Sequence, residues 1–197
     1  MGLFKRKHKI HPKVMEADLV MLMVRQAKAV DTSMMKLAAH YSASSAATLE
    51  QALHSTEPDC IRMLVRHTLH SFLYHEIEAR YGYRAAGQIT MKPLTTSVCD
   101  FSMEDGFSAR TYEYYNTHLN DTYSRLARED QKSHDPIESP AIRELFLSEF
   151  QRIVGATEDI NAEPFFNEVQ NSFKPVITYL NTHILVNHKG QSLLRAK

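Results

Sequence analysis

Glycine and proline are scarce in this chain, which has six glycines and seven prolines among 197 residues. Folds built from β-strands need turn residues at short intervals, so this scarcity disfavours an all-β protein and favours helices. Hydrophobic residues make up 43% of the chain and charged residues 23%, an ordinary globular composition that argues against wholesale disorder. The length is sufficient for one well-cored domain.

Cysteines and long apolar runs are also rare. Cys60 and Cys99 are the two cysteines, and the N-terminal residues do not resemble a secretory signal. These features predict a cytoplasmic, reducing setting, or the inner face of a membrane, with both thiols free. The longest apolar run, residues 19–24, is far shorter than the roughly 18–20 residues that a membrane span requires. We therefore expect a soluble protein.

Acidic residues are missing from the N-terminal segment. Residues 1–13 contain five of the 23 lysines and arginines, which leaves 18 basic against 23 acidic residues in the rest of the chain. An acidic body argues against a broad nucleic-acid-binding face. The basic segment is predicted either to be a solvated end that contacts nothing, or to make weak contact with an anionic membrane surface or an acidic partner. The candidate contact residues are Lys5, Arg6, Lys7 and Lys9.

The hydrophobic periodicity predicts a mostly α, single-domain bundle of six to seven helices over residues 13–187. Residues 1–12 are expected to form a flexible basic tail and residues 188–197 a C-terminal tail. A first helix is predicted to end at Asp31, where residues 31–33 look like a stop followed by a new N-cap. Further helices are expected over 33–41, 45–55, 56–82, 108–130 and 140–154. A shorter and a longer helix are expected between 158 and 187, with Pro175 at the break or kink. The β-branched stretch near 88–103, which contains Pro93, predicts either an irregular excursion or, preferably, a small hairpin.

The segment RHTLHSFLYHE, residues 66–76, is the stretch that most resembles a chemical site. On a helical wheel, His67 and His70 lie opposite the apolar arc, so we interpret them as part of an exposed polar stripe. The alternatives are a pH-responsive or partner-contacting surface and a metal site. A metal would need ligands from a second helix, for which His118 and His183 are the candidates. The HExxH and paired Glu-x-x-His patterns are missing, so neither a metal nor another cofactor is predicted.

Glu76 is an acidic residue that points into the apolar arc of the same predicted helix. Arg80 follows four residues later and can form an ion pair with it. A catalytic carboxylate would show the same pattern, but the ion pair is the preferred interpretation. The nucleophile-elbow, Walker, dinucleotide-binding and CxxC motifs do not occur, which favours a non-catalytic protein without excluding an enzyme.

Methionines and tyrosines supply the candidate residues for partner binding, because both types suit adaptable protein interfaces. They are Met21, Met23, Met34, Met35, Tyr112, Tyr115 and Tyr123. Core filling is the alternative role of the methionines. The leading hypothesis is an adaptor or accessory subunit of a larger assembly, such as a bacterial secretion apparatus, that binds other proteins through a helix-in-groove contact. The alternatives are a metal-binding helical enzyme or sensor using His67 and His70, and a peripheral membrane protein held by the basic N-terminus.

Overall fold

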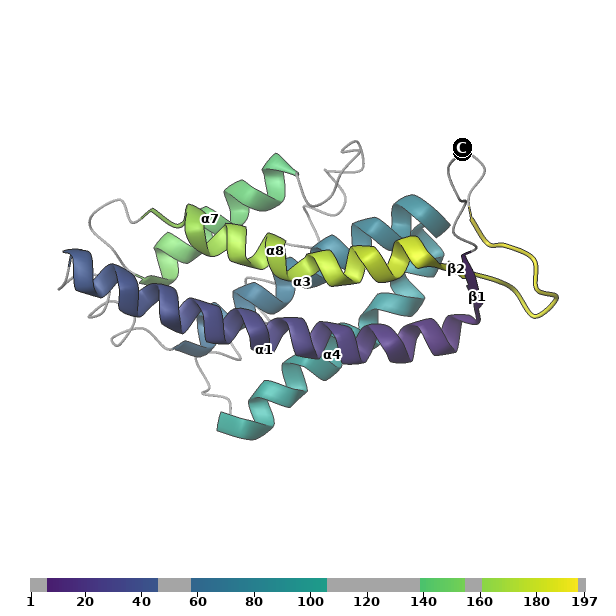
Figure 1. Ribbon diagram of the computed structural model, residues 1–197, viewed down its shortest axis with the longest axis horizontal. Helices are drawn as coiled ribbons and strands as arrows, with labels where there is room; N and C mark the ends of the chain where they lie inside the picture. The colour runs from purple at the N-terminus through teal and green to yellow at the C-terminus, as the bar shows by residue number, and fades with distance from the viewer. Residues whose placement is uncertain (1–6, 46–57, 106–138, 155–160, 195–197) are drawn as a thin grey trace, which may run out of the picture.

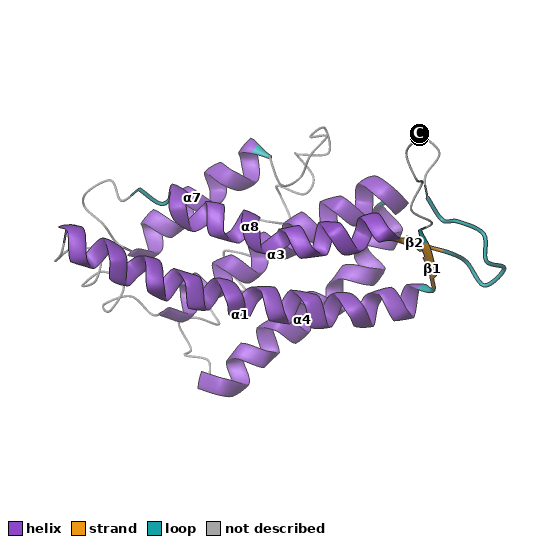
Figure 2. Ribbon diagram, viewed as in Figure 1, coloured by secondary structure: helices purple, strands orange, loops and turns teal. Residues whose placement is uncertain are grey.

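The computed structural model describes residues 7–45, 58–105, 139–154 and 161–194, and this part of the chain is mostly helical (Figures 1 and 2). Its elements are β1 (His8–Ile10), α1 (Pro12–Ser45), α3 (Pro58–Tyr81), α4 (Tyr83–Asp105), α7 (Pro140–Val154), α8 (Glu163–Thr182) and β2 (His183–Leu185). The described ranges thus hold five helices, where six to seven were predicted. The helix predicted over 108–130 lies outside them, and so does nearly all of the helix predicted over 45–55. Within these ranges no helix combines the length and apolar content needed to cross a membrane.

Helix α3 is the centre of the bundle. It contacts α1, α4, α7 and α8, and all seven consecutive residues from 63 to 69 are buried. Seven residues make about two turns, so every side of the helix is covered there. Its predicted extent is confirmed, as is its C-terminal stop: Gly82 has φ of 94°, and its N–H donates to the carbonyl of Glu78 at 2.8 Å.

Helix α1 is one continuous helix of 34 residues, so the predicted break at residues 31–33 is wrong. The Asp31 carboxylate binds the guanidinium of Arg66 in α3 and does not cap a new helix. The Thr32 hydroxyl donates to the carbonyl of Lys28, one turn earlier. The side chains of Asp31 and Thr32 are therefore used in ways compatible with an uninterrupted helix.

Helix α4 replaces the predicted hairpin near 88–103, and this prediction is wrong. Pro93 is buried inside the helix, where it removes one backbone hydrogen bond. The hydroxyls of Thr90 and Ser97 donate to carbonyls of their own helix at 2.9 Å. Ile89 and Val98 are buried on the side that packs against α1 and α3. Tertiary packing of these residues thus outweighs their preference for strands.

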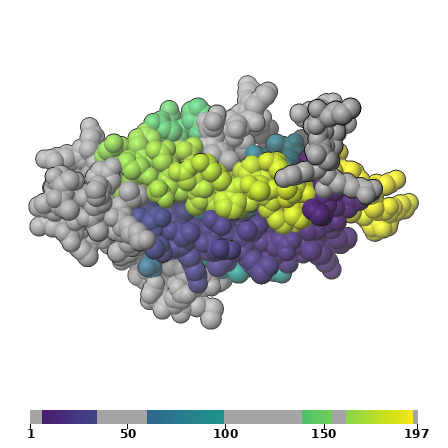
Figure 3. All heavy atoms as spheres, in the orientation of Figure 1, coloured from purple at the N-terminus to yellow at the C-terminus, as the bar shows by residue number. Residues whose placement is uncertain are grey.

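Helices α7 and α8 close the bundle, and α8 lies beside α1 on the face seen in Figure 3. The predicted start of α7 is confirmed, because the Ser139 hydroxyl accepts from the N–H of Ile142 at 3.4 Å. The predicted break at Pro175 is wrong, since α8 continues through this exposed proline. Six phenylalanines from α3, α7 and α8 form the aromatic part of the core: Phe72, Phe146, Phe150, Phe165, Phe166 and Phe173.

The two strands bring the described chain ends together at one end of the bundle (Figure 1). β1 and β2 pair in parallel, with His8 opposite His183 and Ile10 opposite Leu185. The chain then turns back, and the N–H of Leu193 donates to the carbonyl of Leu185 at 2.9 Å. Residues 8–10 and 193, which the sequence placed in terminal tails, are therefore bonded to β2. We call residues 7–13 and 183–194 the strand-end tip.

Candidate functional site

The histidines of α3 are inside the bundle, so the predicted exposed stripe is wrong. His67 is only 2% exposed. His70 is half-buried, and its Nε2 atom has neither solvent access nor a hydrogen-bonding partner among the described residues. The wheel placed these residues opposite the apolar arc, but α3 is covered on every side over residues 63–69. A polar stripe on a central helix therefore faces other helices instead of water.

Burial controls the protonation of these imidazoles. It lowers the pKa of His67 to about 3, with a smaller contribution from the neighbouring His70. Burial likewise lowers the pKa of His70 to about 4; His75 adds to this effect, and a hydrogen bond with the backbone of Thr90 in α4 opposes it. Both imidazoles are thus neutral at pH 7, and protonating either one within the fold is unfavourable.

The predicted metal alternative needs further ligands around this pair. The described part of the chain contains no group of three or more histidine, cysteine or acidic side chains placed to hold a metal ion. His183 lies in β2, where its ring stacks on Tyr179 with 4.1 Å between centroids. His118 falls outside the described residues. The structure therefore places His183 in the strand-end tip, in an aromatic contact.

The predicted ion pair between Glu76 and Arg80 is confirmed, with 2.8 Å between the guanidinium and the carboxylate. Arg80 also donates to the carbonyl of Leu180 at 2.9 Å and to the side chain of Asn181 at 3.0 Å. The pair thereby joins the end of α3 to the end of α8. This arrangement gives the carboxylate a structural partner and a structural role.

A buried charge in the middle of α3 was not anticipated from the sequence. Arg66 is 2% exposed, and its guanidinium binds both carboxylate oxygens of Asp31, at 3.3 and 2.9 Å. It also donates to the carbonyl of Ser97 in α4 at 3.0 Å. One side chain thus connects α1, α3 and α4. No local spacing could reveal it, because the ion pair spans 35 residues.

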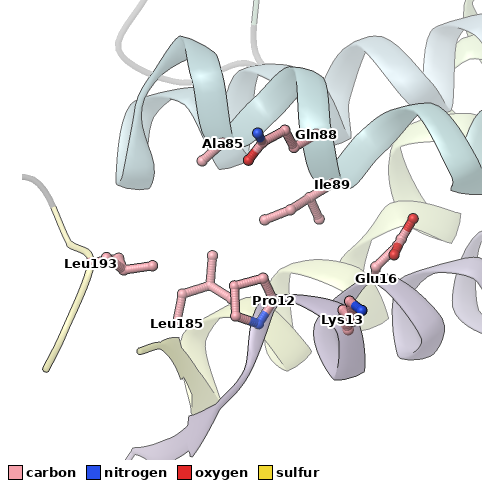
Figure 4. A pocket seen from close by; sticks show the side chains of 8 residues that line it. All are labelled: Pro12, Lys13, Glu16, Ala85, Gln88, Ile89, Leu185 and Leu193. Atoms are coloured by element: carbon pink, nitrogen blue, oxygen red, sulfur yellow. The ribbon is translucent and has the colours of Figure 1, made fainter. Parts of the chain in front are cut away.

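A hollow of about 230 Å³ lies between the strand-end tip and the first turns of α4, and we call it the strand-end hollow (Figure 4). The start of α1, the first turns of α4 and the strand segment each contribute to it. Its apolar lining consists of Pro12, Ala85, Ile89, Leu185 and Leu193, and its polar lining of Lys13, Glu16 and Gln88. The side chains of Ile89, Leu185 and Leu193 converge on the same space in Figure 4.

The lining of the hollow determines which kind of chemical group it could accept. Its lining is mainly aliphatic, so it favours an apolar group, while Lys13 and Glu16 offer one charge of each sign beside it. Sites for cofactors and drug-sized molecules usually span roughly 300–1,000 Å³, which is more than this hollow provides. It is better matched to one large apolar side chain. Sequence reasoning missed it, because its lining comes from three segments far apart in the chain.

The candidate partner residues are distributed over different environments. Met21 is 67% exposed on α1, whereas Met23 and Met34 are buried in the core, and Met35 also belongs to α1. The structure therefore does not gather these methionines on one surface. Tyr112, Tyr115 and Tyr123 lie outside the described residues, as do Lys5 and Arg6. Lys7 and Lys9 are exposed at the strand-end tip.

Comparison of the chain with protein-family models, with curated proteins and with solved structures gave no match in any of the three.

Proposed function

We propose that this chain is a non-catalytic, cytoplasmic interaction module, an adaptor or accessory subunit that binds a partner protein at the strand-end hollow. The occupant is one bulky apolar side chain of a partner segment, such as leucine or phenylalanine. The observation that carries the proposal is the volume and aliphatic lining of the hollow, which suit a side chain better than a cofactor.

The surroundings of the hollow support a protein partner. Leu193 at its edge is 39% exposed and Leu194 is 42% exposed, so apolar surface continues beyond the hollow. Lys13 and Glu16 supply polar groups beside it. An apolar centre with a polar rim is the usual composition of a protein interface. Seating a leucine side chain in such a hollow contributes about 1.5–3 kcal/mol to binding, enough to anchor a short segment.

Selection of phage-displayed random peptides on the immobilised full chain tests this proposal. The selected peptides should share one bulky apolar residue, and replacing it with alanine should weaken binding roughly tenfold to hundredfold. The variant Ala85→Phe fills the hollow and should abolish binding of the same peptides. Ala29→Phe is the matched control, because Ala29 is an exposed alanine of α1 outside the hollow.

Two results would overturn the proposed function. One is a set of selected peptides without a common apolar residue. The other is equal peptide affinity for Ala85→Phe and Ala29→Phe, with circular dichroism showing that both variants are folded.

A further inference from the structure

The two terminal segments of this chain are free of acidic residues. Residues 1–15 and 183–197 together contain eight of the 23 lysines and arginines, while all 23 acidic residues lie between positions 16 and 182. The body of the chain is therefore acidic, with 15 basic residues against those 23. The sequence alone shows that the N-terminal segment is basic, but it does not show that a second basic segment lies beside it. The parallel pairing of β1 with β2 brings it against the C-terminal segment.

The described basic side chains of these segments face solvent at the strand-end tip. Lys7, Lys9, Lys13 and Lys189 are all exposed, and so are the imidazoles of His8, His11 and His188. The Lys9 ammonium donates to the carbonyl of Gly190 at 3.1 Å, which connects the two segments directly. In the sequence, Lys5 and Arg6 precede β1, and Arg195 and Lys197 follow Leu194, so the basic character continues at both ends.

Acidic groups beside the tip offset part of this charge. Glu76 is paired with Arg80, whereas Asp18 keeps its negative charge, because its hydrogen bond at 2.6 Å comes from the neutral Tyr179 hydroxyl. Glu16, which lines the hollow, offsets one lysine. Residues 7–13 and 183–194 themselves contain four lysines and no acidic residue, so the tip is a positively charged end on an otherwise acidic molecule.

We propose that the strand-end tip binds the surface of an anionic lipid bilayer. Exposed lysines beside exposed Leu193 and Leu194 give the combination that such surfaces attract, since the ammonium groups meet lipid phosphates and the leucines reach the interface. Each basic residue near an anionic bilayer strengthens the association roughly fivefold. The tip supplies several such residues from both ends of the chain. This inference rests on charge and goes beyond the proposed function, which rests on the hollow.

Vesicle co-sedimentation of the full chain tests the inference. The probes are vesicles of pure phosphatidylcholine and vesicles of phosphatidylcholine with about 30% phosphatidylglycerol. The chain should bind the anionic vesicles at low salt and not the neutral ones, and binding should decline as ionic strength rises. The triple variant Lys7→Gln, Lys9→Gln, Lys189→Gln should bind anionic vesicles roughly 100-fold more weakly.

A charge-matched control separates the tip from overall charge. The control is the triple variant Arg25→Gln, Lys92→Gln, Lys174→Gln, which removes three exposed positive charges from α1, α4 and α8. This variant should change vesicle binding less than about threefold. Ala85→Phe should keep wild-type vesicle binding, so failure of this inference and failure of the proposed function are distinguishable. The inference is overturned if anionic vesicles are not bound, if both triple variants lose binding equally, or if the tip binds a polyglutamate peptide but not vesicles. The last result would assign it to an acidic protein.

Discussion

Acid should destabilise this fold through the buried histidines of α3, and the effect can be worked out for His67. Its pKa is lowered to about 3 in the folded chain by burial, whereas an unfolded histidine titrates near 6.5. Below pH 6.5 the unfolded chain therefore binds a proton that the folded chain does not bind. The free energy of unfolding falls with decreasing pH over that window, by about 1.4 kcal/mol per pH unit. Between pH 6.5 and pH 5 the loss due to His67 is about 2 kcal/mol.

Urea unfolding of wild type and His67→Leu at pH 7 and pH 5 measures this contribution. The pH-dependent loss in the variant should be smaller than in wild type by about 2 kcal/mol. Part of the loss should remain in the variant, because burial also lowers the pKa of His70, to about 4. His188→Leu is the control at an exposed histidine and should show the wild-type loss. Equal losses in wild type and His67→Leu would refute the reasoning and place His67 in contact with solvent.

Two further substitutions test the connections within the fold. Arg66→Ala should lower the free energy of unfolding by about 3–5 kcal/mol in urea titrations, because it leaves the Asp31 carboxylate without its buried cation; a loss below about 1 kcal/mol would contradict the three-helix connection. Gly82→Ala should lower the melting temperature, with a cost of about 1–2 kcal/mol, because φ of 94° disfavours a side chain; an unchanged melting temperature would show that the turn between α3 and α4 relaxes.

The sequence predicted the elements that carry their own start and stop signals. The α3 stop at Gly82 and the α7 start at Ser139 depend on residues within or directly beside each helix. The Glu76–Arg80 pair is likewise one helical turn long. Such local features need no knowledge of the tertiary structure.

Three of the wrong predictions concern features that distant contacts decide. Asp31 looks like a helix cap until Arg66, 35 residues later, is seen to bind it. The β-branched residues of α4 suggest strands, yet packing against α1 and α3 makes them helical. His67 follows a polar pattern, but whether a polar stripe meets water or another helix depends on the number of neighbours around α3.

The candidate site was beyond sequence reasoning for the same reason. The strand-end hollow combines the first turn of α1, the first turns of α4 and the segment from Leu185 to Leu193. The basic character of residues 1–13 was visible in the sequence. That this segment lies beside residues 183–194 could be seen only from the pairing of β1 with β2. Three-residue strands are too short to produce a recognisable alternation.

The central claim is that the strand-end hollow receives a partner's apolar side chain. Amide chemical-shift mapping by NMR, with a peptide selected on the full chain, can locate the bound side chain. If it enters the hollow, the largest shifts should fall on the residues around it, namely Lys13, Glu16, Gln88, Ile89, Leu185 and Leu193. The largest shifts at the far end of the bundle, around α7 and the start of α8, would contradict the claim.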